Sequence, residues 1–136
     1  AGWRGTVNRI LAKTLHRIQS AYGTRGTDVI ACIGPGISLD SFEVGDEVYE
    51  AFRTENFPME YISVWKPETH KYHIDLWVAN RLQLSDFGVP PRQIENAGIC
   101  TYRQHEDFFS ARRLGIKSGR ILSGIMLNRQ EKEERK

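Results

Sequence analysis

The sequence predicts an α/β protein, a layered sandwich of helices around a mixed sheet. Segments whose apolar residues recur with helical spacing alternate with short β-branched runs, and glycine or proline stands between them. Strands that alternate with helices in this way form layered α/β domains. The 136 residues, 40% of them hydrophobic, are enough for one compact domain.

The first predicted helix covers residues 7–22, where apolar side chains return at intervals of three, four and seven residues. Thr6 is a plausible cap at its start, and Gly23 ends it because glycine readily adopts a left-handed conformation. The basic residues of this segment fall on the opposite, solvated side of the helix. These are Arg9, Lys13 and Arg17.

The next element is a strand. Residues 28–33 are apolar after Asp28 and run into Gly34-Pro35-Gly36, a pattern typical of a buried strand that ends in a tight loop. Asp40 and Glu43 then have the spacing of a capping box, which predicts a helix that starts there and stops before Pro58. Its inward face is expected to consist of Val44, Val48, Ala51 and Phe52.

The remaining elements continue the alternation. Residues 61–65 are predicted as a second strand, and residues 74–87 as a buried helix that Gly88 ends. Residues 94–102 and 121–127 are predicted as the third and final strands. Residues 128–136 are almost all charged or polar, and we expect this tail to be frayed.

Composition excludes several classes of protein. A formal net charge of +2 is low for a nucleic-acid-binding surface, which is usually strongly basic. No apolar run approaches the roughly 18 residues of a membrane span, and the start lacks the pattern of a signal peptide. We therefore expect no nucleic-acid partner, no membrane contact and a cytoplasmic location. Cys32 and Cys100 are far apart, without a CxxC motif, and are expected to be reduced and buried.

Small groups of His and Cys residues offer only weak candidates for chemistry. His70 and His73 could share a metal ion across a turn, but no further ligands are in view, and Cys32 with Cys100 and His105 matches no structural zinc spacing. Cys100 and His105 could also form a nucleophile and base. A buried cysteine beside a surface histidine explains the same residues more simply.

Arginines near glycine and serine are more suggestive. Arg4 lies in a glycine-flanked loop before a helix, and Arg112, Arg113 and Arg120 lie in a second stretch that also holds two serines. Guanidinium groups, hydroxyls and backbone amides together provide the fixed donors that a phosphate needs. Phe108 and Phe109 could form an apolar wall for a flat ring. Surface arginines in salt bridges remain the simpler alternative.

Five ordered blocks then resemble the laccase-domain family, whose bacterial members are now understood as purine nucleoside phosphorylases. The blocks are Ala1-Gly2-Trp3-Arg4-Gly5, Ile33 to Ile37 with Phe42-Glu43-Val44, Asp75-Leu76 with Asn80 to Leu84, Cys100-Thr101, and Phe108 to Arg113 with Ser118-Gly119-Arg120. The resemblance spans nearly the whole chain and predicts the C-terminal half of one laccase-like domain at residues 1–127. The missing N-terminal half is then its expected partner.

The resemblance implies a metal site that this chain does not contain. The family motif starts with a histidine immediately before the position of Ala1, and that histidine is one of three ligands, the others being a histidine and a cysteine farther upstream. The implied metal is zinc, or copper in older descriptions. None of the ligands is in this sequence, and neither Cys32 nor Cys100 matches the ligand cysteine.

For activity, the resemblance implies phosphorolysis of adenosine, inosine and methylthioadenosine to the free base and ribose 1-phosphate or its thio analogue. Adenosine deamination by a metal-activated water is the implied second activity. The residues expected to act on phosphate are Arg4, Arg112 and Arg120, and those expected at the substrate are Gly34, Cys100, Thr101, Phe109 and Ser110. Fixed cations suit this reaction because phosphate must be held against an oxocarbenium-like ribose.

The chain departs from the family pattern at two positions. Ala111 stands where an aromatic residue is usual, which could open the pocket or change the nucleoside that fits, and Ser118 replaces a threonine while keeping the hydroxyl. Two other functions remain as alternatives: a copper-dependent polyphenol oxidase, and a non-catalytic protein of cell-wall editing or protein contacts. The absence of His-x-His pairs disfavours a multicopper centre.

Overall fold

The computed structural model describes residues 1–128 and confirms the α/β class with both parallel and antiparallel strand pairing. The helices are α1 (Trp3–Val7), α2 (Ile10–Tyr22), α3 (Asp46–Thr54), α4 (Met59–Ile62), α5 (Leu76–Phe87) and α6 (Ala111–Leu114). The strands are β1 (Ala31–Ile33), β2 (Glu43–Val44), β3 (Ser63–Lys66), β4 (Lys71–Ile74) and β5 (Ile94–Asn96). The predicted tail, residues 128–136, lies outside the described residues except for Asn128.

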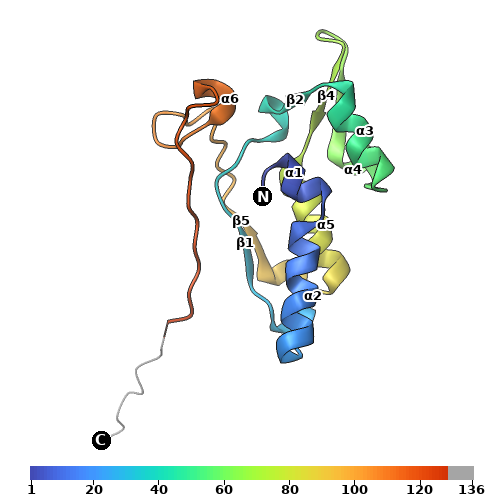
Figure 1. The fold of residues 1–136 in the computed structure, drawn as a ribbon, viewed down its shortest axis with the longest axis vertical. Coiled ribbons are helices and arrows are strands. Elements are labelled where there is room, and N and C mark those ends of the chain that lie inside the picture. Colours follow the sequence, from blue (N-terminus) through green and yellow to red (C-terminus); the bar gives the residue numbers. More distant parts are fainter. Residues whose placement is uncertain (129–136) are drawn as a thin grey trace, which may run out of the picture.

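The strands of the described part form two small sheets. In the first, β1 and β5 pair in parallel, with Ala31 opposite Ile94. In the second, β4 lies between β2 and β3 and is antiparallel to both. Helix α5 runs between the two sheets, and α2 lies beside it (Figure 1).

Helix α5 separates two apolar cores. One contains Phe52, Ile62 and Ile74, packed between α3, α4 and the antiparallel sheet, and takes in Ala79 of α5. The other contains Leu15, Leu84 and Ile94, between α2, α5 and the parallel sheet. Burial of these side chains is the main force that holds the elements together. Within residues 1–128, no helix has the length and apolar character needed to cross a membrane.

The predicted single helix over residues 7–22 is wrong, because the chain breaks between α1 and α2. Arg9 stands at the break in a left-handed conformation, with φ of 57°. Its guanidinium group donates a hydrogen bond to the Glu55 carbonyl at 2.9 Å and lies 4.2 Å from the centre of the Phe57 ring. These tertiary contacts hold Arg9 in a conformation that helical periodicity does not anticipate.

A buried polar network bridges the break and ties it to α5. The Gln83 side chain accepts from the Ala12 amide at 3.1 Å and donates to the Thr6 carbonyl at 3.3 Å. Asn80 Nδ2 donates to Thr6 Oγ1 at 3.1 Å. The prediction that Thr6 caps a helix is therefore wrong: Thr6 is a fully buried residue within α1. Gln83 accepts from the Ala12 amide in the first turn of α2, an amide that has no hydrogen-bond partner within the helix.

Several predicted strands are shorter than the apolar runs that suggested them. Strand β1 begins at Ala31, β3 begins at Ser63 because Tyr61 belongs to α4, and β5 ends at Asn96. Cys32 is exposed, not buried as expected, because alternate side chains of a strand point to opposite faces and the partly buried Ala31 and Ile33 take the inner one. Cys100 is buried as expected, and both cysteines are free thiols.

The prediction of a final strand at residues 121–127 is also wrong. This segment has no strand partner among the described residues, and its apolar side chains are exposed, Leu122 at 97% and Leu127 at 91%. It extends away from the body of the protein (Figure 1). An apolar run of this kind forms a strand only where another strand offers its backbone groups.

The helix boundaries also shift. Asp40 lies in a short 3-10 turn, so α3 begins at Asp46 rather than near residue 40, although Val48 and Phe52 are buried as expected. Helix α5 begins two residues late because Ile74 belongs to β4, and the Asp75 side chain caps it by accepting from the Val78 amide at 3.0 Å. The expected termination at a left-handed Gly88 is confirmed.

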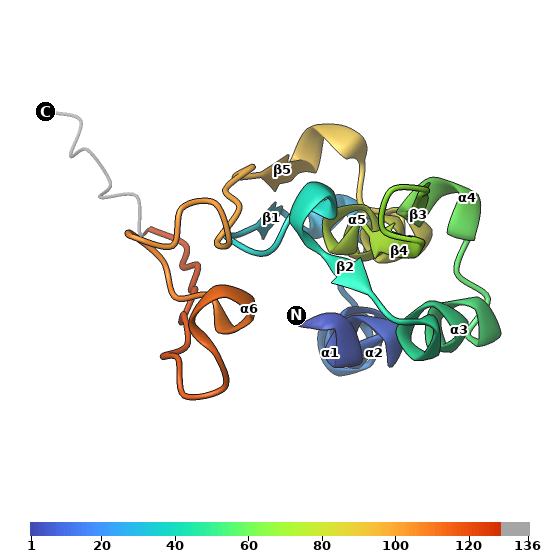
Figure 2. The same cartoon turned by 90° about the horizontal axis from the view of Figure 1, so that it is seen from above.

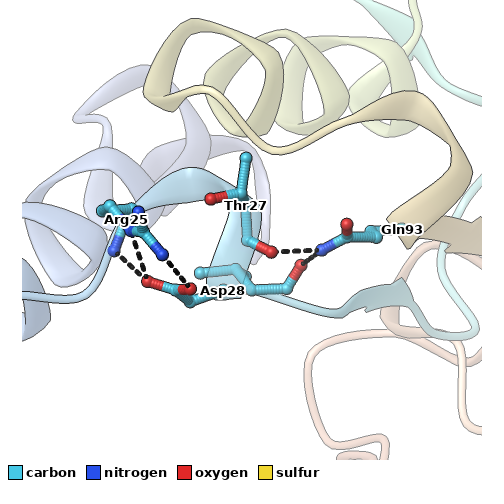
Figure 3. Close-up of polar contacts among 5 residues, drawn as sticks. Arg25, Thr27, Asp28 and Gln93 are labelled. Atoms are coloured by element: carbon cyan, nitrogen blue, oxygen red, sulfur yellow. Dashed lines mark hydrogen bonds and ion pairs between the residues drawn. The ribbon is translucent and has the colours of Figure 1, made fainter.

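Side-chain contacts align the two strands of the parallel sheet. Gln93, just before β5, donates to the carbonyls of Thr27 and Val29 at 3.0 and 2.7 Å (Figure 3). Arg25 and Asp28 form an ion pair in the same turn, at 3.2 Å. The Gln93 bonds hold the segments before β1 and β5 together, and because the two strands are parallel, the loops that follow them leave from the same edge.

Candidate functional site

The candidate site lies at the carboxyl ends of β1 and β5. The Gly36 amide donates to the Ile99 carbonyl at 3.1 Å, and the Thr101 amide donates to the Gly36 carbonyl at 3.1 Å. The loops that leave the two parallel strands are thus joined. In α/β proteins, ligands commonly bind at the carboxyl ends of parallel strands, where loops are free to carry polar groups.

A cleft of about 480 Å³ opens beside these joined loops. Its walls are residues 1–2, 35–37, 76–77 and 119–121, with Thr101, Phe109, Ala111 and Ser123. The N-terminus lies between α1 and α6, so the cleft brings together segments from both ends of the chain (Figure 2). A volume of this size is within the range of small-molecule sites.

Three of the residues expected at phosphate or substrate line this cleft: Thr101, Phe109 and Arg120. The Arg120 side chain is exposed, and its Nη1 donates to the carbonyls of Ser118 and Gly119. These two bonds fold the side chain back on its own loop. They use one of the guanidinium nitrogens and leave donors on the others for a ligand.

Phe109 presents an open aromatic face. Its side chain is 55% exposed. A Cβ atom on Gly119 would lie 2.7 Å from the nearest atom of the Phe109 ring. The ring therefore lies directly against the backbone of residue 119, and only glycine allows that approach.

The other expected site residues lie outside this cleft. Gly34 lines a neighbouring cleft of about 420 Å³, together with Cys32. Arg4 is exposed and lies 4.7 Å from the centre of the Trp3 ring. Ser110 is buried and caps α6 by accepting from the Arg113 amide at 3.3 Å.

Arg112 holds α6 against β2. Its Nη1 donates to the Glu43 carbonyl at 2.7 Å, and its guanidinium group lies 5.2 Å from the centre of the Phe42 ring. A side chain engaged in this way positions the loop that carries Phe109. It does not line the cleft in the present arrangement.

Cys100 lies at the junction of the two loops, next to Thr101. Its Sγ accepts from the Ser38 hydroxyl at 3.1 Å and from the Ser38 amide at 3.4 Å, and lies 3.6 Å from Ser41 Oγ. Burial opposes ionisation of the thiol, but hydrogen bonds from Ser38, the Arg103 amide and Ser41 outweigh it and lower the pKa of Cys100 to about 7. Cys100 is therefore held inside the loop junction and does not line the cleft.

Gly36 and Trp77 are among the cleft residues that the sequence analysis did not select as site residues. Trp77 falls within the segment predicted as a buried helix, residues 74–87, yet it lines the cleft from the first turn of α5. One signal in the sequence was available. A buried indole N–H requires an acceptor, and Trp77 stands two residues after Asp75, which caps the helix that follows β4.

The described residues do not form a metal site. Within residues 1–128, no three His, Cys, Asp or Glu side chains lie close enough together to hold an ion. His73 is buried between other partners: its Nδ1 lies 2.8 Å from the Leu39 carbonyl, and its Nε2 lies 3.6 Å from Glu43. The histidine therefore joins β4 to β2, and the residues present do not fit a metal ion.

Comparison with known proteins identifies similar sequences. The sequence profile of a family described as multi-copper polyphenol oxidoreductase laccase matches residues 1–128. The chain is 64% identical over 129 residues to a purine nucleoside phosphorylase of Bacteroides thetaiotaomicron, covering 95% of this chain and 48% of that protein. It is 49% identical over 125 residues to adenosine deaminase RL5 of an unknown prokaryotic organism, covering 92% of this chain and 47% of the relative.

Solved structures agree with the sequence comparisons. YlmD from Geobacillus stearothermophilus superposes with a TM-score of 0.73 at 34% identity, and the Bacillus licheniformis protein YfiH with 0.75 at 32%. Each match covers 83% of this chain and 42% of the solved chain. The chain thus spans about half the length of the relatives that it matches.

Proposed function

Because the chain belongs to the family described as multi-copper polyphenol oxidoreductase laccase, we propose that it contributes one wall of the active site of a purine nucleoside phosphorylase. The substrates are adenosine, inosine and methylthioadenosine with inorganic phosphate, and the products are the free base and ribose 1-phosphate or its thio analogue. Deamination of adenosine is a second activity. The names of the relatives at 64% and 49% identity support both reactions.

The observation that carries this proposal is the cleft at the ends of β1 and β5, which brings together Thr101, Phe109 and Arg120. In phosphorolysis, a phosphate oxygen forms a bond to C1′ of the ribose while the bond from C1′ to the base nitrogen breaks. The bonding electrons leave with the base. A guanidinium group at the phosphate orients the nucleophile, and an aromatic face holds the base in line with it.

In this proposal the three arginines have different roles. Arg120 lines the cleft and is the phosphate-binding residue of this chain. Arg4 lies two residues after Gly2, which lines the cleft, and reaches the phosphate by turning away from the Trp3 ring. Arg112 acts on phosphate only if its bond to the Glu43 carbonyl opens, so we assign it first to the position of α6.

We assign the metal of the family, zinc or copper, to residues outside this chain, because the residues described here do not fit one. The remaining part of a laccase-like domain would supply the ligands and pack against this chain. This follows from the share of the relatives that the chain leaves unmatched.

A copper-dependent polyphenol oxidase is the second candidate, and the description of the family favours it. The two activities have different requirements. Phosphorolysis consumes phosphate and releases a base, whereas phenol oxidation scales with copper occupancy and is indifferent to phosphate.

The test uses a complemented protein, defined as this chain combined with the part of the Bacteroides thetaiotaomicron relative that it does not span. Loaded with metal, it is incubated with inosine, and hypoxanthine is measured with and without inorganic phosphate. We expect release that depends on phosphate. A folded, metal-loaded protein that oxidises phenols but releases no hypoxanthine would favour the oxidase instead.

A further inference from the structure

One donor in the cleft lacks an acceptor. Among residues 1–128, Nε1 of Trp77 is the single buried side-chain nitrogen or oxygen without a hydrogen-bond partner. Buried tryptophan N–H groups usually find a partner, and an exception calls for an explanation. Because Trp77 also lines the cleft, a ligand is the natural source of that acceptor.

The surroundings of Trp77 hold the indole in place. The residue lies in the first turn of α5, whose start is fixed by the cap from Asp75 to the Val78 amide. On the other side, a Cβ atom on Gly36 would lie 3.3 Å from Nε1. Gly36 is itself held by hydrogen bonds to residues 99 and 101. The indole N–H is therefore set beside the loop junction from which the cleft opens.

The chemistry of the donor restricts the ligand group that it recognises. An indole N–H is a neutral donor with no accepting capacity, so it suits a ring nitrogen or a carbonyl oxygen. A phosphate is better served by the charged guanidinium of Arg120 in the same cleft. Phe109, 55% exposed, adds an aromatic face for a flat ring. The indole N–H and the Phe109 face thus suit a base, and the Arg120 guanidinium suits a phosphate.

We propose that Trp77 recognises the purine base, by donating its indole N–H to one acceptor of the base. The nitrogen is closed to solvent in the ligand-free chain, so contact requires a shift of the loop formed by Gly34, Pro35 and Gly36. This shift requires Gly36 to release its hydrogen bonds with residues 99 and 101. The inference rests on the proposed function, because it takes a nucleoside as the ligand.

The first test is Trp77→Phe in the complemented protein, with Trp65→Phe as the matched control. Trp65 lies on β3, outside the cleft, and is 44% exposed. Dissociation constants for inosine and for inorganic phosphate are measured separately by calorimetry. Loss of one neutral hydrogen bond should weaken inosine binding about threefold to tenfold. Phosphate binding should stay unchanged, and Trp65→Phe should match the wild type.

A second measurement covers the case in which Trp77→Phe does not fold. Binding of inosine to the unmodified protein is compared with that of 3-deazainosine, 7-deazainosine and purine riboside, which lack the N3, N7 and O6 acceptors in turn. The proposal is supported if one analogue binds the unmodified protein more weakly than inosine does and this difference in affinity disappears in Trp77→Phe. Where the variant does not fold, weaker binding of one analogue alone supports it.

Several outcomes would overturn it. Trp77 would not contact the base if folded Trp77→Phe bound inosine as the wild type does, or if it lost affinity for phosphate instead of inosine. The same would follow if all three analogues bound the unmodified protein as tightly as inosine. In those cases, phosphate-dependent release of hypoxanthine by the same protein would still leave the proposed function intact. Absence of both binding and release would reject the function together with the inference.

Discussion

Replacing Gln83 by methionine should destabilise the chain strongly, because this one side chain serves two backbone groups at the break between α1 and α2. Methionine has a similar size and helix propensity but no hydrogen-bonding amide. The Ala12 amide would lose its side-chain acceptor, whereas the Thr6 carbonyl would keep the hydrogen bond that it accepts from the Arg9 amide. Each buried group left without a partner costs about 1–3 kcal/mol.

The expected loss in the free energy of unfolding is about 2–4 kcal/mol: about 1–3 kcal/mol for the Ala12 amide left without an acceptor, and about 1 kcal/mol for the bond lost at the Thr6 carbonyl. Urea unfolding followed by circular dichroism measures the change in the free energy of unfolding. Gln19→Met, on the exposed side of α2, is the control and should lie within about 0.5 kcal/mol of the wild type. A Gln83→Met variant as stable as this control would show that the network does not hold the two helices together.

Three further predictions concern the cleft and its supports. Arg120→Ala in the complemented protein should raise KM for phosphate about tenfold or more, as expected for a lost charged hydrogen bond. Lys117→Ala, outside the cleft, is the control and should leave KM unchanged. Steady-state kinetics at varied phosphate measure both, and equal KM values for the two variants would refute the prediction. Ala111→Tyr should narrow the cleft that Ala111 lines and raise KM for nucleosides more than for phosphate; equal effects on both would contradict a steric role. The pKa of Cys100 falls from 9.0 to about 7 on folding, so its ionised form stabilises the fold fully above pH 9 and this contribution is lost as pH falls through 7. The difference in the free energy of unfolding between wild type and Cys100→Ala should therefore shrink from pH 9 to pH 7, as measured by urea unfolding. A constant difference would argue that the Ser38 hydrogen bonds do not lower the pKa of Cys100.

Local signals in the sequence predicted those features that depend on neighbouring residues. Gly23 and Gly88 end their helices as expected because each adopts the left-handed conformation that glycine tolerates. Val48 and Phe52 are buried because helical spacing sets the inward face of α3. Residue type and context pointed to Phe109 and Arg120, and the family resemblance added Thr101; the cleft brings these three residues together from separate segments.

The features that the sequence did not predict depend on contacts between distant residues. Arg9 leaves the helical conformation because Glu55 and Phe57, far along the chain, hold its side chain. The apolar run at residues 121–127 has the composition of a strand, but a strand also needs a partner, and none lies within residues 1–128. Trp77 was missed for a similar reason, since helical periodicity does not reveal that Gly36 faces its indole.

The account depends on the cleft at the ends of β1 and β5 being the place where nucleoside binds. A crystal structure of the complemented protein with inosine tests this most directly. The account predicts the base against Phe109, with Thr101 and Trp77 in contact and the ribose turned toward Arg120. Inosine bound elsewhere, for example in the neighbouring cleft beside Cys32, with the Phe109 face empty, would contradict it.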